Sequence, residues 1–113
     1  LLSHYERVKG EGYRLAVVEV EGHVGCVGGF KLRTSLLWGR FLEIEDLVLS
    51  AHPLAKEYAA GLVEWLVNLA KSEGCVSIKV NIPHLHADGL ALFLTRGFRS
   101  VGQHLEHATR GAT

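Results

Sequence analysis

The clearest hydrophobic pattern in the chain lies in residues 54–74 and has the period of a helix. Apolar side chains recur there at intervals of three and four residues, and charged side chains lie off that face. The apolar positions are Leu54, Tyr58, Leu62, Trp65, Leu66 and Leu69. Pro53 precedes the pattern and Gly74 follows it, which are the usual places of these residues at the two ends of a helix. The pattern therefore predicts one long amphipathic helix.

Four other segments are rich in β-branched and apolar residues, and this composition predicts strands. They are residues 13–21, 24–32, 41–49 and 75–82. The first two are joined at Glu21-Gly22-His23, which favours a turn and an antiparallel hairpin. The last two flank the long helix with short connections. Strand, helix and strand in this order form a right-handed crossover, which makes the two strands parallel.

Three glycines interrupt the second strand, at Gly25, Gly28 and Gly29. Glycine inside a strand indicates a bulge or the close approach of another group to the backbone. These glycines open no helix, so they do not form a dinucleotide-binding fingerprint. We expect a bulged strand here.

The remaining segments predict shorter elements. Residues 87–95 favour a second, shorter helix and residues 98–106 a final strand, whereas residues 1–9 favour a short helical piece. We take residues 1–12 as the remnant of an N-terminal element and residues 107–113 as a frayed tail. The whole chain, 1–113, is expected to be a single α/β (α+β) domain. Its sheet is mixed, twisted and mostly antiparallel, around a central parallel β-α-β crossover.

Composition narrows the classes of partner. The 12 basic and 12 acidic residues cancel, and no basic run is present, so we expect neither nucleic acid nor a membrane as a partner. No segment reaches the roughly 18 consecutive apolar residues of a transmembrane span. Cys26 and Cys75 lie in apolar segments without a C-x-x-C motif, which is typical of buried thiols in a reducing cytoplasm. A disulfide between them stays open at this stage.

The order of these elements and two motif-like stretches resemble the GNAT superfamily of N-acetyltransferases, over residues 13–106. The family has [Gln/Arg]-x-x-Gly-x-[Gly/Ala] at the start of its long helix, and an ungapped alignment puts Leu54, Glu57 and Ala59 at these positions. A second family signature is Asn-x-x-Ala-x-x-Leu-Tyr-x-x-x-Gly-Phe. It falls on His86, Gly89, Leu92, Phe93, Gly97 and Phe98. The resemblance implies that the chain is truncated at the N-terminus relative to the family.

The resemblance implies acetyl-CoA as co-substrate and an amine as acceptor, either a small amine or a peptide N-terminus or lysine. The residues that it places at the cofactor are Leu47, Val48, Leu49, Leu54, Ala55, Lys56, Glu57, Tyr58, Ala59, His86 and Phe93. Amides at the start of the helix would hold the pyrophosphate, aided by the helix dipole. A Glu57 carboxylate about 5 Å from a phosphate would cost roughly 1 to 3 kcal/mol, part of which Lys56 would offset.

The same resemblance places a general base at Glu43, and Glu45 leaves the same face of the strand two residues later. Such an acidic pair would bind a cationic acceptor and raise the pKa of one carboxyl. The alternative is a solvated polar strand face. Phe93 replaces the family's tyrosine, the general acid for the departing thiolate, and is equally explained as a core aromatic residue.

Histidines at His84, His86, His104 and His107 fall short of a zinc site, which needs three or four ligands with a fixed second shell. Leu37 and Trp38 lack cover in the expected fold, and one sheet edge is open. We therefore expect a homodimer, formed through that edge or by exchange of the last strand. Two functions stay open: an acetyl-CoA-dependent N-acetyltransferase, or a GNAT-like binding or oligomerisation module that has lost CoA binding and catalysis.

Overall fold

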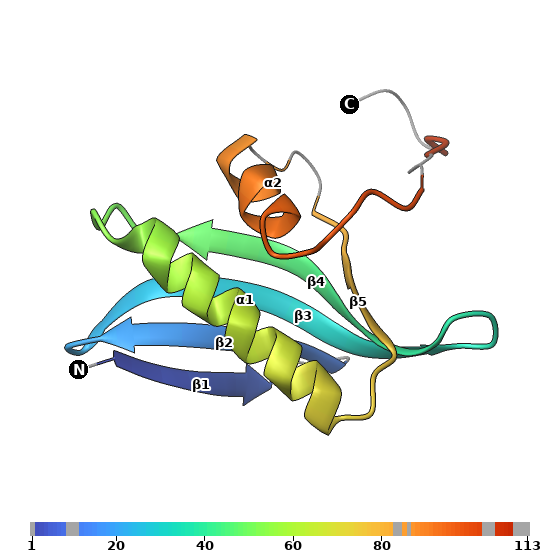
Figure 1. Ribbon diagram of the computed structural model, residues 1–113, viewed down its shortest axis with the longest axis horizontal. Helices are drawn as coiled ribbons and strands as arrows, with labels where there is room; N and C mark the ends of the chain where they lie inside the picture. Colours follow the sequence, from blue (N-terminus) through green and yellow to red (C-terminus); the bar gives the residue numbers. More distant parts are fainter. Residues whose placement is uncertain (1, 9–11, 83–84, 86, 103–105, 110–113) are drawn as a thin grey trace.

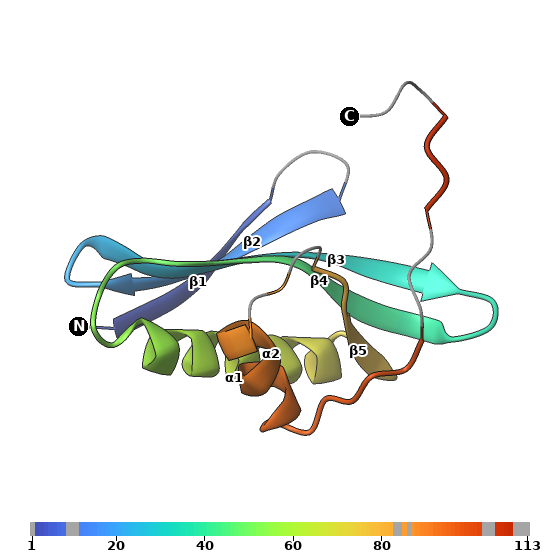
Figure 2. The same ribbon diagram turned by 90° about the horizontal axis from the view of Figure 1, so that it is seen from above.

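The computed structural model describes residues 2–8, 12–82, 85, 87–102 and 106–109, and within 2–8 only the side chains of His4 and Glu6. Its strands form one sheet in the order β1-β2-β3-β4-β5. The elements are β1 (Leu2–Val8), β2 (Tyr13–Val20), β3 (His23–Ser35), β4 (Gly39–Leu49), α1 (Ala55–Ser72), β5 (Ser77–Val80) and α2 (Ala87–Leu94). Both helices lie on the same face of the sheet (Figures 1 and 2).

The long helix organises the core as its sequence pattern predicts. The side chains of α1 that are buried against the sheet are Ala55, Ala59, Leu62, Val63, Leu66 and Ala70. They meet the core-facing residues of the strands, among them Val18, Phe30 and Leu42, each fully shielded from solvent. Gly74 ends the helix with φ 74°, a conformation that glycine adopts without strain. The amphipathic face thus fixes which side of the sheet α1 covers.

The predicted hairpin and crossover are both confirmed. Strands β2 and β3 are antiparallel and turn at Glu21 and Gly22, which have positive φ angles of 51° and 81°. Strands β4 and β5 are parallel on either side of α1, and their register runs from Phe41↔Ser77 to Ile44↔Val80. The parallel ladder is short, because β5 ends at Val80 while β4 continues to Leu49.

Two bulges interrupt the antiparallel part of the sheet. The register between β2 and β3 shifts after Val18 and leaves Gly25 as the extra residue, so the bulge predicted from the glycines is confirmed. A Cβ atom at Gly25 would lie 2.8 Å from a ring carbon of Tyr58, so the helix packs directly on this backbone. A second shift leaves Glu45 as the extra residue on β4, which the sequence did not predict.

Both ends of the chain differ from the sequence-based prediction. The helical piece expected in residues 1–9 is wrong, since β1 pairs antiparallel with β2 from Leu2↔Val20 to Val8↔Arg14. The strand expected in residues 98–106 is absent from the described part of that segment, 98–102 and 106. Instead Phe98 folds back on Phe93, with ring centroids 5.2 Å apart and a Phe98 N–H to Phe93 C=O bond of 3.1 Å. Strand pairing is non-local, so local composition predicts it poorly.

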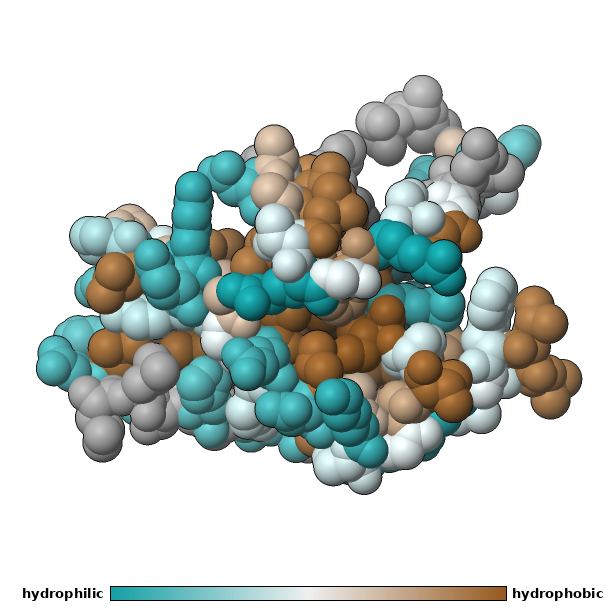
Figure 3. Space-filling model, viewed as in Figure 1, coloured by the Kyte–Doolittle hydropathy of each residue, from teal (hydrophilic) through white to brown (hydrophobic). Residues whose placement is uncertain are grey.

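Several surface and core expectations are met. Cys26 is buried and Cys75 partly buried, and neither forms a disulfide. Leu37 and Trp38 are exposed at the hairpin between β3 and β4, as predicted, and apolar side chains protrude there (Figure 3). Among the described helices, none is long and apolar enough to cross a membrane.

Candidate active site

Strand β4 leaves its parallel partner halfway along its length. The last contact between them is the Asn81 N–H bond to the Ile44 carbonyl, 2.8 Å long. On the other side, the Ser50 N–H still bonds the Gly25 carbonyl of β3. Because alternate residues of a strand direct their amides to the same side, the amides of Leu47 and Leu49 point away from β3. They face an opening that no described strand fills.

A cavity of about 450 Å³ lies beside this open edge, within the usual range for ligand pockets. It is bounded by the end of β4, the start of α1 and the inner face of α2. The lining residues are Leu47, Leu49, Lys56, Ala59, Leu85, Asp88, Gly89, Ala91, Leu92 and Thr95. Four of the predicted cofactor residues are therefore brought together: Leu47, Leu49, Lys56 and Ala59.

The start of α1 presents free backbone donors close to this cavity. His52 stabilises the turn that leads into the helix, since its carbonyl accepts the Ala55 N–H and its ring Nδ1 accepts the Leu54 N–H, both at 3.0 Å. The first bond of the helix runs from the Tyr58 N–H to the Leu54 carbonyl. The amides of Lys56 and Glu57 have no hydrogen-bond partner in the described part of the chain. With the helix dipole, they favour an anion at this point.

One ion pair joins the two helices at the cavity. Lys56 Nζ of α1 lies 3.5 Å from Asp88 Oδ2 of α2, and both side chains also line the cavity. The two side chains are 75% and 80% exposed, so the pair itself adds little stability. An anion bound in the cavity would compete with Asp88 for the Lys56 ammonium.

The predicted acidic pair lies on the opposite face of the sheet, where one arginine holds both carboxylates. Arg33 Nε donates to Glu43 Oε1 at 2.6 Å and Arg33 Nη2 donates to Glu45 Oε2 at 2.9 Å. Partial burial favours neutral Glu45, but the hydrogen bonds with Arg33 and Glu43 and the nearby positive charges outweigh burial. They hold the pKa of Glu45 below its usual value. The expected rise in pKa is thus wrong for Glu45.

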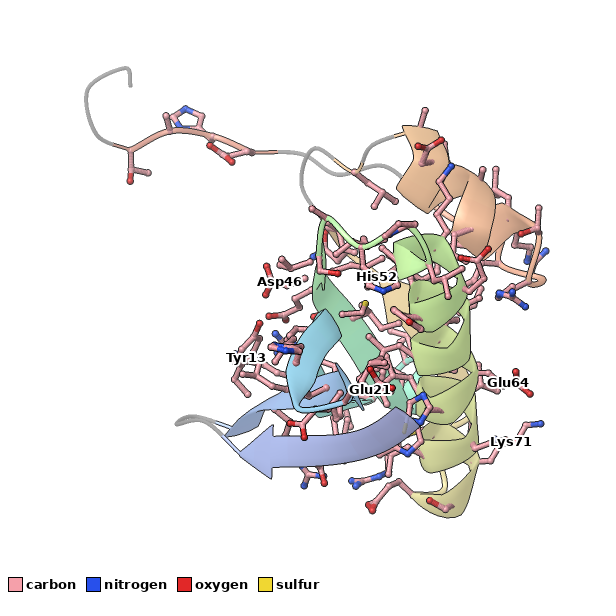
Figure 4. All side chains as sticks on the ribbon, turned by 90° about the vertical axis from the view of Figure 1, so that its left-hand side faces the viewer. Tyr13, Glu21, Asp46, His52, Glu64 and Lys71 are labelled. Carbon is pink, nitrogen blue, oxygen red and sulfur yellow. The ribbon has the colours of Figure 1, made fainter. Side chains whose placement is uncertain are left out.

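A tyrosine and an aspartate that the sequence did not single out meet on the same face. The Tyr13 hydroxyl donates to Asp46 Oδ2, and Figure 4 shows the two side chains together, on the side of the sheet away from α1. Burial, the bond to Asp46 and the charges of Asp46 and Glu45 raise the pKa of Tyr13 to about 12. The contact crosses Gly29, where a Cβ atom would lie 1.7 Å from the tyrosine oxygen. Gly29, predicted as a close-approach site, was the available signal.

The structure resembles solved N-acetyltransferases over most of its length. Against ribosomal-protein-alanine N-acetyltransferase from Brucella melitensis biovar Abortus, the TM-score is 0.72 at 16% identity, over 88% of this chain and 70% of that one. Against glucosamine-6-phosphate N-acetyltransferase from Arabidopsis thaliana, the TM-score is 0.71 at 20% identity, over 89% of this chain and 69% of that one. Against a GNAT family acetyltransferase from Staphylococcus aureus, the TM-score is 0.68 at 15% identity, over 87% of this chain and 66% of that one. The chain has the GNAT fold.

The GNAT fold is recognised from the structure and not from sequence similarity. No protein-family model matches the sequence, and no curated protein matches it. At identities of 20% or lower, the similarity in structure establishes the fold alone. The predicted fold class is confirmed, with its mixed sheet and parallel β4-α1-β5 crossover.

In the GNAT fold, the cavity supports a different register for the helix-start motif. Of the residues aligned from sequence, Leu54 is 48% exposed and Glu57 is exposed, and neither lines the cavity. An alignment two residues further on gives Lys56, Ala59 and Gly61 at the three motif positions. A basic residue then occupies the first position and a glycine the third, and Lys56 and Ala59 line the cavity. This register removes Glu57 from the glycine position.

The other predicted cofactor residues that the structure describes do not line the cavity. Val48 is 63% exposed, and Ala55 is buried against the sheet. Tyr58 packs on Gly25 and on the His52 ring, 5.3 Å between ring centroids. Phe93 is 2% exposed within the core, which agrees with its interpretation as a core aromatic residue. His86 lies outside the described residues.

The histidines form no metal centre in the part of the chain that the structure describes. Groups of three or more His, Cys, Asp or Glu side chains that could hold an ion are absent there. Of the histidines weighed from sequence, His84, His86 and His104 lie outside the described residues.

Proposed function

We propose that the protein is an acetyl-CoA-dependent N-acetyltransferase that transfers the acetyl group to an amine. The observation that carries this proposal is the cavity of about 450 Å³, where the open edge of β4 meets the start of α1 within a GNAT fold. A strand edge with free amides and a helix start with free amides are the two features that a thioester and a pyrophosphate need.

The residues around the cavity take distinct roles in this proposal. The amides of Lys56 and Glu57 and the Lys56 ammonium bind the pyrophosphate of CoA. The amide of Leu47 or Leu49 donates a hydrogen bond to the thioester carbonyl, which stabilises the oxyanion of the tetrahedral intermediate. The apolar side chains of Leu47, Leu49 and Leu92 contact the pantetheine chain.

The departing thiolate receives its proton from water. Phe93 stands where the resemblance places a tyrosine, and it is buried and has no hydroxyl. A thiolate is a moderately basic leaving group, so a solvent proton suffices, at the cost of the roughly 10²- to 10⁴-fold that a positioned acid contributes. We therefore expect a slow enzyme.

Binding of acetyl-CoA is the direct test. At a concentration 100 times its dissociation constant, acetyl-CoA should stabilise the protein by about 2.7 kcal/mol, visible as a rise in the thermal midpoint. Lys56→Ala is the matched variant and should lose about half of the rise, because tenfold weaker binding leaves acetyl-CoA at about 10 times its dissociation constant. The Lys56 side chain is exposed and contributes little to folding. The absence of any shift in the wild-type protein at millimolar acetyl-CoA would overturn the proposal.

The acceptor is proposed only as a class. The structural neighbours are named for a ribosomal-protein alanine and for glucosamine 6-phosphate, which share a primary amine. We propose a small amine, a peptide N-terminus or a lysine as acceptor, and a cytoplasmic location, where unpaired thiols such as Cys26 and Cys75 persist. The even charge balance supports partners other than nucleic acid or membranes.

A second candidate function is a binding or oligomerisation module without catalysis. Two observations favour it. Arg33 forms ion pairs with both predicted acidic residues, Glu43 and Glu45. Apolar side chains are also exposed at the β3–β4 hairpin, those of Leu36, Leu37 and Trp38. In either case we propose a homodimer, formed through the open edge of the sheet. A strictly monomeric species in sedimentation equilibrium at high micromolar concentration would contradict the dimer. Dimers without any response to acetyl-CoA would favour the module.

A further inference from the structure

We propose that Asp46, held by Tyr13, is the carboxylate that accepts the proton of the acceptor amine, in place of Glu43 or Glu45. The proposal rests on the proposed acetyltransferase function. It follows from a comparison of the three carboxylates that β4 carries in succession on the face away from α1, and from the position of Asp46 beside the open edge of the strand.

The partners of the three carboxylates differ in charge. Glu43 and Glu45 are each hydrogen-bonded to the Arg33 guanidinium, which stabilises the ionised carboxylates and occupies an oxygen of each. A base in such a pair would have to give up a charge-assisted bond to take a proton. The partner of Asp46 in the described structure is the neutral hydroxyl of Tyr13, which contacts one of the two carboxylate oxygens. Asp46 is exposed, and within the described part of the chain its other oxygen, Oδ1, has no hydrogen-bond partner and can receive a proton.

The backbone places Asp46 next to the amides that would hold the thioester. Ile44 is the last residue of β4 that pairs with β5, and Asp46 follows it by two positions. The next residue, Leu47, directs its amide to the open edge and its side chain into the cavity. Adjacent Cα atoms are about 3.8 Å apart. Asp46 therefore lies one residue from the proposed oxyanion donor.

The side chain of Asp46 reaches the face opposite the cavity. A Cβ atom at Gly28 would meet Leu62 of α1, whereas one at Gly29 would meet Tyr13 and, at 2.9 Å, Asp46 Oδ2. Gly29 and Asp46 are thus on the face away from α1. An amine that approaches from this face contacts Asp46. It reaches a thioester bound in the cavity through the opening between β4 and β5.

Tyr13 is a positioning residue in this arrangement. Its ring comes from β2 and crosses β3 at Gly29 to reach β4, which only a residue without a Cβ permits. With a pKa of about 12, its hydroxyl stays protonated and continues to donate to Asp46 over the neutral pH range. The donor fixes the orientation of the carboxylate without adding a charge that would compete with the amine.

The chemical step balances with these groups and water. The amine nitrogen forms a bond to the thioester carbonyl carbon, and Asp46 takes one proton from the nitrogen. Collapse of the tetrahedral intermediate breaks the carbon–sulfur bond, and sulfur leaves with the electron pair as a thiolate. Water protonates the thiolate, and Asp46 returns its proton to solvent. No oxidant, reductant or metal takes part.

The test is steady-state kinetics of the full chain with acetyl-CoA. The amine probes are glucosamine 6-phosphate and a peptide with an N-terminal alanine, and the release of the CoA thiol is the signal. Asp46→Ala should lower kcat about 10²- to 10⁴-fold while leaving the affinity for acetyl-CoA unchanged. Added formate should restore part of the rate, because a small carboxylate can replace a missing base but not a missing structural contact. Tyr13→Phe keeps the ring and should lower kcat about tenfold.

Glu43→Gln and Glu45→Gln are the matched controls, and each should change kcat by less than about threefold. Asp46→Asn keeps the shape of the side chain and replaces Asp46→Ala in the kinetic test if Asp46→Ala fails to fold. A wild-type rate in Asp46→Asn, or a larger loss in Glu43→Gln or Glu45→Gln, would overturn the assignment. If acetyl-CoA causes no thermal shift in the wild-type protein, the proposed acetyltransferase function is contradicted. If the shift is present and the Asp46 variants keep the wild-type rate, only the assignment of Asp46 is contradicted.

Discussion

The two halves of β4 have the same strand geometry and opposite surroundings. In the inner half, before Glu45, the strand pairs with β3 on one side and β5 on the other, and Leu42 and Ile44 are 0% and 1% exposed. In the outer half β3 is its one partner among the described strands, and Val48 and Leu49 are 63% and 39% exposed. The bulge at Glu45 separates the halves. Pairing on both edges builds the core, whereas loss of one partner frees the amides and apolar surface that a ligand needs.

Truncation of one leucine in each half should give the largest contrast. Leu42→Ala removes a fully buried side chain and should lower the free energy of unfolding by about 2 to 5 kcal/mol. Leu49→Ala, the matched change in the outer half, should cost about 1 kcal/mol or less, because solvent already reaches the side chain. Urea unfolding of both variants measures the difference. Equal losses would show that the outer half is part of the core.

A pH titration of the free energy of unfolding tests whether water reaches the face of the outer half of β4 that lies against α1. Cys26 pairs with Leu49 in the sheet and is 1% exposed, and burial raises its pKa from 9.0 to about 11. The unfolded chain therefore releases this proton at a lower pH than the folded one. The stabilisation is full below about pH 9 and is lost as the pH rises towards 11, by at most about 2 kcal/mol.

Cys26→Ala is the control for this titration, because it removes the thiol and should make stability fall less steeply between pH 9 and pH 11. Both proteins carry Tyr13, whose pKa is raised from 10.0 to about 12 and makes stability fall from about pH 10 upward, so only the difference between the two proteins reports on Cys26. Superimposable curves would mean that water reaches the thiol.

The ion pair at the cavity gives a smaller effect on binding. Lys56→Ala should weaken acetyl-CoA binding about tenfold, since it removes one charge-assisted bond to a phosphate. Asp88→Asn should strengthen binding about threefold, because the Lys56 ammonium no longer has a competing carboxylate. Isothermal titration calorimetry at two salt concentrations measures both. Weaker binding in Asp88→Asn would show that Asp88 supports the ligand.

Glu57→Gly gives the smallest expected change and separates the two motif registers. In the sequence-based register, this substitution removes a carboxylate from the pyrophosphate and strengthens CoA binding. In the register that the cavity supports, Glu57 faces solvent, and the affinity should stay within about twofold of wild type. A gain of tenfold or more would restore the sequence-based register.

Local patterns were sufficient for much of this protein. The helical period of residues 54–74, the hairpin signal at Gly22 and the strand on each side of the helix predicted α1, the β2–β3 hairpin and the parallel crossover. These follow from the sequence because they depend on side-chain periodicity and turn chemistry within a few residues. Part of the candidate site followed too, since Leu47, Leu49, Lys56 and Ala59 line one cavity.

The tertiary structure decided what depends on distant partners. Residues 2–8 form strand β1, which pairs with the edge of β2, whereas residues 98–102 form no strand although their composition favours one. Arg33 from the neighbouring strand binds both Glu43 and Glu45, the pair in which the resemblance implies the base. Asp46 gained a partner in Tyr13, 33 positions away in the chain. Sequence determines what a residue can do, whereas strand register determines which residues meet, and register is fixed only when the whole sheet forms.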